Sequence, residues 1–111
     1  MDTSFLSCRI DHNRLNNVDP TQDLRSLAQA FEINDDLLQG TYQNGLVIDV
    51  GWFDIESVSD VDGPYRLRCF LVRVIRESDW QTPCVQFVAR DFFELDAALR
   101  ACDLWACGRN S

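Results

Sequence analysis

The chain has 111 residues, 46% of them hydrophobic and 25% charged, so it suits one domain with an ordinary core and not a disordered protein. It has 18 acidic residues against 10 basic ones, a net charge of -8, and every basic residue is an arginine. Its longest apolar stretches fall well short of the roughly 20 residues that a membrane span needs, and Met1–Ser4 does not resemble a secretory signal. We therefore expect one cytoplasmic domain, residues 1–111, that does not bind a membrane.

The first two expected elements are a short strand and a helix. Residues 4–10 alternate between apolar and polar positions, which predicts a strand, and the polar run from Asp11 to Asn17 should end it. Asp19 followed by Pro20 is typical of a helix start, because aspartate caps the free N–H groups and proline fits the first helical position. Apolar residues then recur at helical spacing, so the predicted helix covers Asp19–Leu38.

Three strands should follow, in an antiparallel meander. Alternating or β-rich residues predict strands over Gly45–Phe53, Tyr65–Ile75 and Cys84–Ala89. In the second of these, the polar face changes side between Phe70 and Arg73. Either a β-bulge there or burial of both faces of the strand would account for the change.

A last helix should begin after Asp91, which can cap it, with Glu94 at the reciprocal position of a capping box. Its apolar face is expected to lie on the sheet, and Gly108 suits the residue after the helix. The predicted order is β-α-β-β-β-α. The fold class is therefore α+β, an antiparallel sheet of three to four strands with two helices packed on one face.

Charge is sorted by sign along the chain. Gly45 to Gly63 contains five carboxylates and no basic residue, whereas Tyr65 to Arg76 contains four arginines and no acid. We expect the two stretches to be neighbours in the sheet, with cross-strand ion pairs each worth no more than about 1 kcal/mol when exposed. The candidate residues for these pairs are Arg66, Arg68, Asp49 and Asp54.

An acidic protein of this size favours a basic partner. The predicted partner-binding surface is the acidic turn after the Gly45–Phe53 strand, with Asp54, Glu56, Asp60 and Asp62. Trp80 lies in a polar connection, where it is either an exposed anchor for the partner or a lid that packs over the sheet.

Sequence signatures of metal, DNA or catalytic sites are incomplete. The stretch from Asp60 to Gly63 resembles the middle of a calcium loop, but Val58 and Cys69 would stand where carboxylates are required. The stretch from Leu24 to Leu38 faintly resembles a helix-turn-helix, but the acids that would open its second helix repel phosphate. Phosphate-binding loops and nucleophile elbows are not found. We expect no catalytic residues, metal, cofactor or direct nucleic-acid binding.

The five cysteines contain no Cys-x-x-Cys pair, so we interpret most of them as reduced, buried, small apolar residues. One alternative stays open. Cys8 and the only histidine, His12, could together form a reactive thiol site in a small thiol-dependent protein or enzyme.

The segment from Gly45 to Trp105 resembles the small acidic immunity proteins of bacterial contact-dependent and polymorphic toxin systems. The resemblance rests on Leu46-Val47-Ile48-Asp49-Val50-Gly51-Trp52, an acidic turn ending in Gly63, Tyr65-Arg66-Leu67, Asp79-Trp80 with Pro83, and a terminal amphipathic helix. It implies a non-enzymatic inhibitor that binds a toxin of the same organism, commonly a basic nuclease. A second hypothesis is an acidic mimic of nucleic acid that blocks a defence nuclease. That mimic would need carboxylates spaced along an extended face, not concentrated between Asp49 and Asp62.

Overall fold

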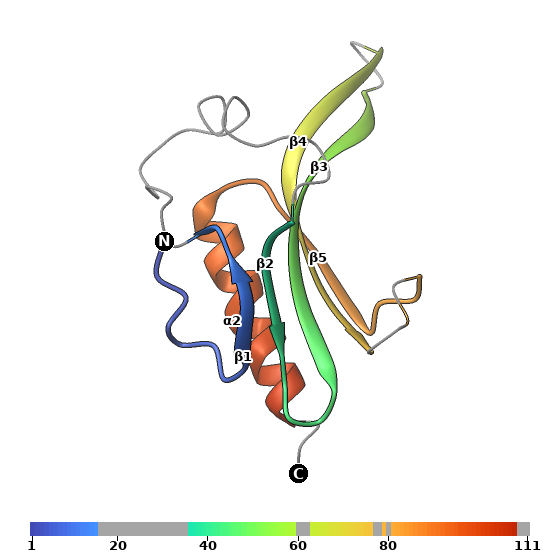
Figure 1. The fold of residues 1–111 in the computed structure, drawn as a ribbon. Helices are drawn as coiled ribbons and strands as arrows, with labels where there is room; N and C mark the ends of the chain where they lie inside the picture. Colours follow the sequence, from blue (N-terminus) through green and yellow to red (C-terminus); the bar gives the residue numbers. More distant parts are fainter. Residues whose placement is uncertain (16–35, 60–62, 77–78, 80, 109–111) are drawn as a thin grey trace.

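The computed structural model describes residues 1–15, 36–59, 63–76, 79 and 81–108, and within the strands it does not describe the side chains of 54–59 and 63–68. The described residues form a five-stranded antiparallel sheet in the order β1-β2-β3-β4-β5, with the helix α2 packed on one face (Figure 1). The strands are β1 (Arg9–Asn13), β2 (Asp36–Thr41), β3 (Leu46–Ser59), β4 (Gly63–Arg76) and β5 (Val85–Ala89). Helix α2 covers Phe92–Gly108.

The prediction of a three- to four-stranded sheet with two helices is therefore wrong, while an α+β class remains consistent with the fold. The described residues contain five strands and one helix. Residues 36–38, which were expected to end the Asp19–Leu38 helix, begin β2 instead. There Leu37 and Leu38 are completely buried in the core. Leu38 pairs with Val50 of β3, and Leu37 lies at a shift of the register between the two strands. The remainder of that predicted helix lies outside the described residues.

The first strand is also shifted from its predicted place. Residues 4–10 were expected to form it, and the polar run after Ile10 was expected to end it, but β1 covers Arg9–Asn13. The polar side chains are tolerated because β1 is an edge strand with largely exposed residues. A β-bulge between Ile10 and His12 adjusts its pairing with β2.

The antiparallel meander of β3, β4 and β5 is confirmed, and so is the final helix with its cap. However, β3 continues to Ser59 instead of ending at Phe53. Asp54 and Glu56, which were expected in the acidic turn, therefore lie in a strand that pairs with β4. The register of β3 with β4 runs without interruption from Leu46↔Arg76 to Ser59↔Gly63, so there is no β-bulge in β4. Burial of both faces is the correct alternative, since Cys69 and Ile75 are completely buried on one face and Phe70 on the other. Asp91 accepts a hydrogen bond from the Glu94 N–H at 2.7 Å, and Glu94 accepts one from the N–H of Arg90 at 3.2 Å.

The core lies between α2 and the adjacent face of the sheet. Trp52 and Phe70 meet edge to face across β3 and β4 with ring centroids 4.9 Å apart, and Phe92 of α2 lies 5.5 Å from Phe70. Such aromatic pairs stabilise a core beyond the area that they bury. The helix adds completely buried side chains to this cluster: Leu95, Leu99, Cys102 and Ala106.

Leu99 provides a test of the helix register. Replacing it with alanine should lower the free energy of unfolding by about 2–5 kcal/mol, because the substitution leaves a cavity in a fully buried site. Chemical denaturation measures this loss. Ala97→Ser, on the exposed side of the same helix, is the matched control and should change stability little. Equal stability of Leu99→Ala and the native protein would place Leu99 outside the core.

Candidate functional site

The two longest strands form a hairpin that projects beyond the rest of the sheet (Figure 1). Strands β3 and β4 each have 14 residues, but β2 pairs with β3 only as far as Gly51, and β5 pairs with β4 only as far as Phe70. Among the described residues, 53–59 and 63–69 therefore pair only with each other. We call this part of the two strands the hairpin arm. The predicted partner-binding acids belong to the arm and the residues that join its strands.

The register of the arm sets acids opposite arginines. Asp54 stands opposite Arg68, and Glu56 stands opposite Arg66. The hairpin therefore places positions of the acidic stretch opposite positions of the arginine stretch. Asp60 and Asp62 fall between the paired residues Ser59 and Gly63 in the sequence, and they lie outside the described residues, as does Trp80.

At the base of the arm, Asp49 forms a buried ion pair with Arg73. The Arg73 Nη2 donates to the Asp49 Oδ2 at 2.9 Å, with the Asp49 side chain completely buried and that of Arg73 18% exposed. The guanidinium of Arg73 also lies 5.8 Å from the ring centroid of Phe53. Burial raises the pKa of Asp49, and the hydrogen bond from Arg73 opposes that rise. Among the described residues, the other oxygen, Oδ1, has no hydrogen-bond partner. The prediction that Arg66 or Arg68 pairs with Asp49 is therefore wrong, because the register sets Arg73 opposite Asp49.

A second buried carboxylate, Asp103, joins α2 to the N-terminal segment and to β2. It accepts hydrogen bonds from the Tyr42 hydroxyl at 2.7 Å, the Ser7 N–H at 2.9 Å and the Ser7 hydroxyl at 3.2 Å. Burial, together with the hydrogen bond to Asp103, raises the pKa of Tyr42 well above its usual range. Only 8% of the Asp103 surface is exposed. Its hydrogen bonds join α2 to the N-terminal segment at Ser7 and to Tyr42, directly after β2.

Beside this network lies a cavity of about 440 Å³. Its lining residues come from the N-terminal segment, β2 and the end of α2: Ser7, Cys8, Arg9, Thr41, Tyr42, Gln43 and Cys107. Burial raises the pKa of Cys8 to about 11, and the neighbouring Asp103 adds to the rise. A raised pKa lowers the fraction of thiolate, which is the reactive form of cysteine.

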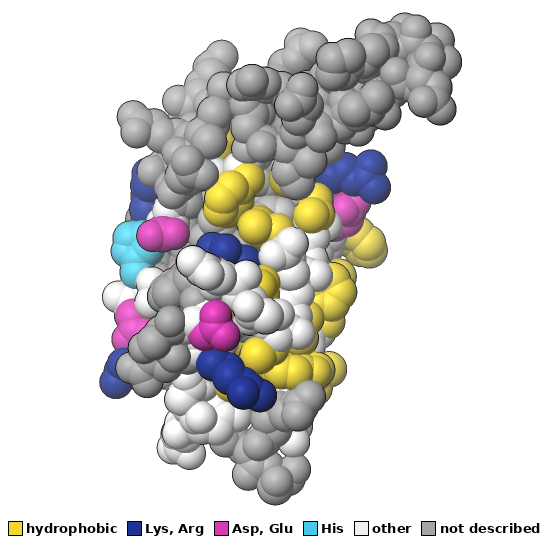
Figure 2. All heavy atoms as spheres, turned by 90° about the vertical axis from the view of Figure 1, so that its right-hand side faces the viewer, with side chains coloured by type: hydrophobic (Ala, Val, Ile, Leu, Met, Phe, Trp, Pro, Cys, Tyr) yellow, Lys and Arg dark blue, Asp and Glu magenta, His cyan; other side chains and the backbone are white. Residues whose placement is uncertain are grey.

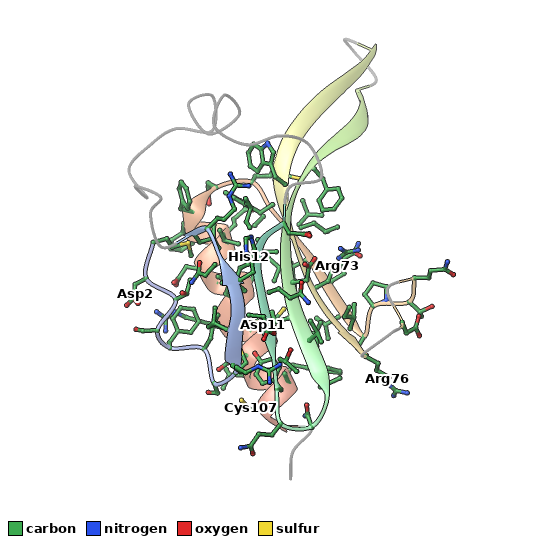
Figure 3. The ribbon with its side chains drawn as sticks, viewed as in Figure 1. Asp2, Asp11, His12, Arg73, Arg76 and Cys107 are labelled. Atoms are coloured by element: carbon green, nitrogen blue, oxygen red, sulfur yellow. The ribbon has the colours of Figure 1, made fainter. Side chains whose placement is uncertain are left out.

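Cys8 and His12, the alternative thiol pair, make separate contacts in the structure. Cys8 lines the cavity together with Cys107, whereas the His12 Nε2 lies 2.8 Å from the carbonyl oxygen of Asp36. In Figure 3, Cys107 lies low in the view, near the end of α2, and His12 lies higher, on β1. Within the described part of the chain, no cluster of three or more His, Cys, Asp or Glu residues could hold a metal ion.

The thiols should therefore react in order of exposure. Cys84 is exposed and should be alkylated first, Cys8 should react slowly because its pKa is raised, and the buried Cys69 and Cys102 should react only on unfolding. Burial also raises the pKa of Cys102 to about 12. Mass spectrometry after brief alkylation of the native protein gives the order, with fully denatured protein as the control. Preferential labelling of Cys8 would contradict this order and favour the thiol-dependent alternative.

No helix among the described residues has the length and apolar character needed to cross a membrane. Comparisons of the chain with protein families, with curated proteins and with solved structures find no match.

Proposed function

We propose that this protein is a non-enzymatic binding protein of the immunity type, which inhibits a basic toxin or nuclease by contact through the hairpin arm and the acidic residues that stand between its two strands in the sequence. The proposed contact residues are Asp54, Glu56, Asp60 and Asp62, with Trp80 as an apolar anchor. The net charge of -8 would draw a basic partner to this surface and speed its capture.

The observation that supports this proposal is the projection of the hairpin arm from the sheet. An isolated two-stranded hairpin is marginally stable in water, so strands that extend past their neighbours gain most from a surface on another molecule. The arm is also the part of the fold where a partner can approach both edges of the strands. A binding role explains why β3 and β4 are much longer than the strands beside them.

The register refines which acids would matter most. Asp54 and Glu56 face Arg68 and Arg66, so their charge is partly balanced within the hairpin. Asp60 and Asp62 stand between the paired residues Ser59 and Gly63 in the sequence, outside the described residues. The same pairing weighs against a nucleic-acid mimic, because alternating acids and arginines do not imitate a row of phosphates.

Genomic context tests the proposal most cheaply. Immunity genes adjoin the toxin genes that they neutralise, so we expect a toxin-bearing reading frame immediately upstream of this gene. The purified product of that reading frame should bind the protein and lose its toxicity. A gene that stands among housekeeping enzymes, or a neighbouring toxin that the protein neither binds nor inhibits, would contradict the proposal.

A further inference from the structure

The solvent-facing side of α2 displays the two most exposed large apolar side chains of the described structure. Phe93 is 84% exposed and Leu104 is 75% exposed. Between them on the same side lie the exposed residues Ala97 and Arg100. Isolated apolar residues on a surface are ordinary. Here Phe93 and Leu104 share one helix face with the small Ala97, and together with the charged Arg100 they form a stripe along the helix.

The spacing of this stripe is that of a helix–helix seam. Phe93, Ala97, Arg100 and Leu104 are separated by four, three and four residues, which is the repeat that packs one helix along another. The opposite face of α2 packs on the sheet, where Leu95 and Leu99 are buried. The stripe is therefore available for a second molecule, and we call it the α2 seam.

The α2 seam of one copy is complementary to the α2 seam of a second copy that runs in the opposite direction. In an antiparallel pair related by a two-fold axis between residues 98 and 99, Phe93 meets Leu104 of the second copy, and Ala97 meets Arg100. The small Ala97 leaves room for the long Arg100 side chain. The same arrangement brings Asp96, next to the seam, close to Arg100 of the other copy.

Charge on this face is balanced, in contrast to the rest of the chain. Asp96 and Arg100 form an ion pair at 2.9 Å within one helix, with side chains 42% and 57% exposed. The Arg100 guanidinium also lies 4.1 Å from the ring centroid of Phe5, which holds it along the helix. Two copies can therefore meet here without bringing uncompensated acids together, despite the net charge of -8.

We propose that the α2 seam is a docking surface for a second copy of this chain, in an antiparallel helix pair. The seam is about 18 Å long, because 12 residues each rise about 1.5 Å. An interface of this length is small, and small interfaces form weak, concentration-dependent dimers. The dimer leaves the hairpin arm of each copy free, so it does not depend on the function proposed above.

Sedimentation of the full chain tests the proposal, over concentrations from about 10 μM to about 1 mM, the range in which weak interfaces associate. The apparent mass should rise from 12.8 kDa towards twice that value. Leu104→Glu should abolish the rise. Val88→Glu, on an equally apolar but separate exposed site of β5, is the matched control and should leave it intact. A native protein that stays at the mass of one chain, or a Leu104→Glu variant that still associates like the control, would overturn the proposal.

Two charge variants test the antiparallel register. Asp96→Arg alone and Arg100→Asp alone should each remain monomeric, because like charges would meet across the seam. An equimolar mixture of the two variants should associate again, because opposite charges then face each other. Asp36→Arg is the control for the change in net charge and should associate as the native protein does. Failure of the mixture to associate, with both variants folded by circular dichroism, would overturn the register.

The salt dependence of association distinguishes the dimer from binding of a basic partner. Screening of the net negative charge should leave the dimer unchanged or strengthen it, since its apolar contacts do not weaken with salt. Binding of a basic partner through the proposed acidic contact residues should weaken as the salt concentration rises. A dimer that dissociates as salt rises would overturn the proposed apolar seam.

Discussion

Reversing Glu56 and Asp60 to lysine should slow association with the basic partner by roughly ten- to a thousandfold at low salt, the range that electrostatic steering provides. The reason is that both acids belong to the proposed contact surface, where their charge would attract an approaching basic partner. The dissociation rate should change less, because exposed charges act mainly on encounter. Stopped-flow or surface-plasmon measurements with the product of the adjacent toxin gene separate the two rates.

The control has the same change in net charge away from the arm. Asp2→Lys with Asp36→Lys alters two exposed acids, so it should slow association far less than the arm variant does. Trp80→Ala should act in the opposite way and mainly speed dissociation, as expected for a buried apolar anchor. Unchanged association of the Glu56→Lys/Asp60→Lys variant at low salt would show that these acids do not belong to the contact surface.

Replacing Arg73 with methionine should lower the free energy of unfolding by about 3–5 kcal/mol, because it leaves Asp49 as a buried charge without its partner. The loss should shrink at acidic pH. Burial already raises the pKa of Asp49 above its usual 3.8, so the folded protein holds this proton more tightly than the unfolded chain does. The contribution of this group to stability is present below its unfolded pKa and is lost as pH rises through the folded pKa.

Two further variants distinguish a buried ion pair from simple packing. Asp49→Asn keeps the shape and an acceptor for Arg73, and should cost no more than about 1 kcal/mol. The double variant Asp49→Leu/Arg73→Met should be far more stable than Arg73→Met alone, because it leaves no unpaired buried charge at this site. Urea denaturation over a range of pH measures all three. A double variant no more stable than Arg73→Met alone would contradict the coupling of the two residues.

The strands and helix of the second half were predictable because their signals are local. The capping residues Asp91 and Glu94 mark the start of α2 within four positions, and alternation marks β3 and β5. The partner of Asp49 was not predictable in this way. Arg73 lies 24 residues further along the chain, so only the register of the hairpin assigns it to Asp49.

The errors also have physical causes. Leu37 and Leu38 fit an amphipathic helix as well as a buried strand, and only pairing with β3 decides between them. Gly40 lies in β2, where a Cβ atom would come within 2.5 Å of the Cys8 sulfur. This close approach depends on the packing of distant residues, so the sequence pattern around Gly40 does not predict it. Phe93 directly follows the core residue Phe92 in α2, yet it faces solvent. Figure 2 shows that further hydrophobic side chains gather on the side of the molecule that carries β5.

Hydrogen exchange of the complex tests the central claim most directly. In the free protein, the amides of residues 53–59 and 63–69 should exchange faster than those of β3 and β4 beside β2 and β5, because the arm strands pair only with each other among the described residues. Binding of the toxin encoded next to this gene should protect the arm amides strongly and leave α2 unchanged. Protection confined to other parts of the sheet, with the arm exchanging as it does in the free protein, would contradict capture through the hairpin arm.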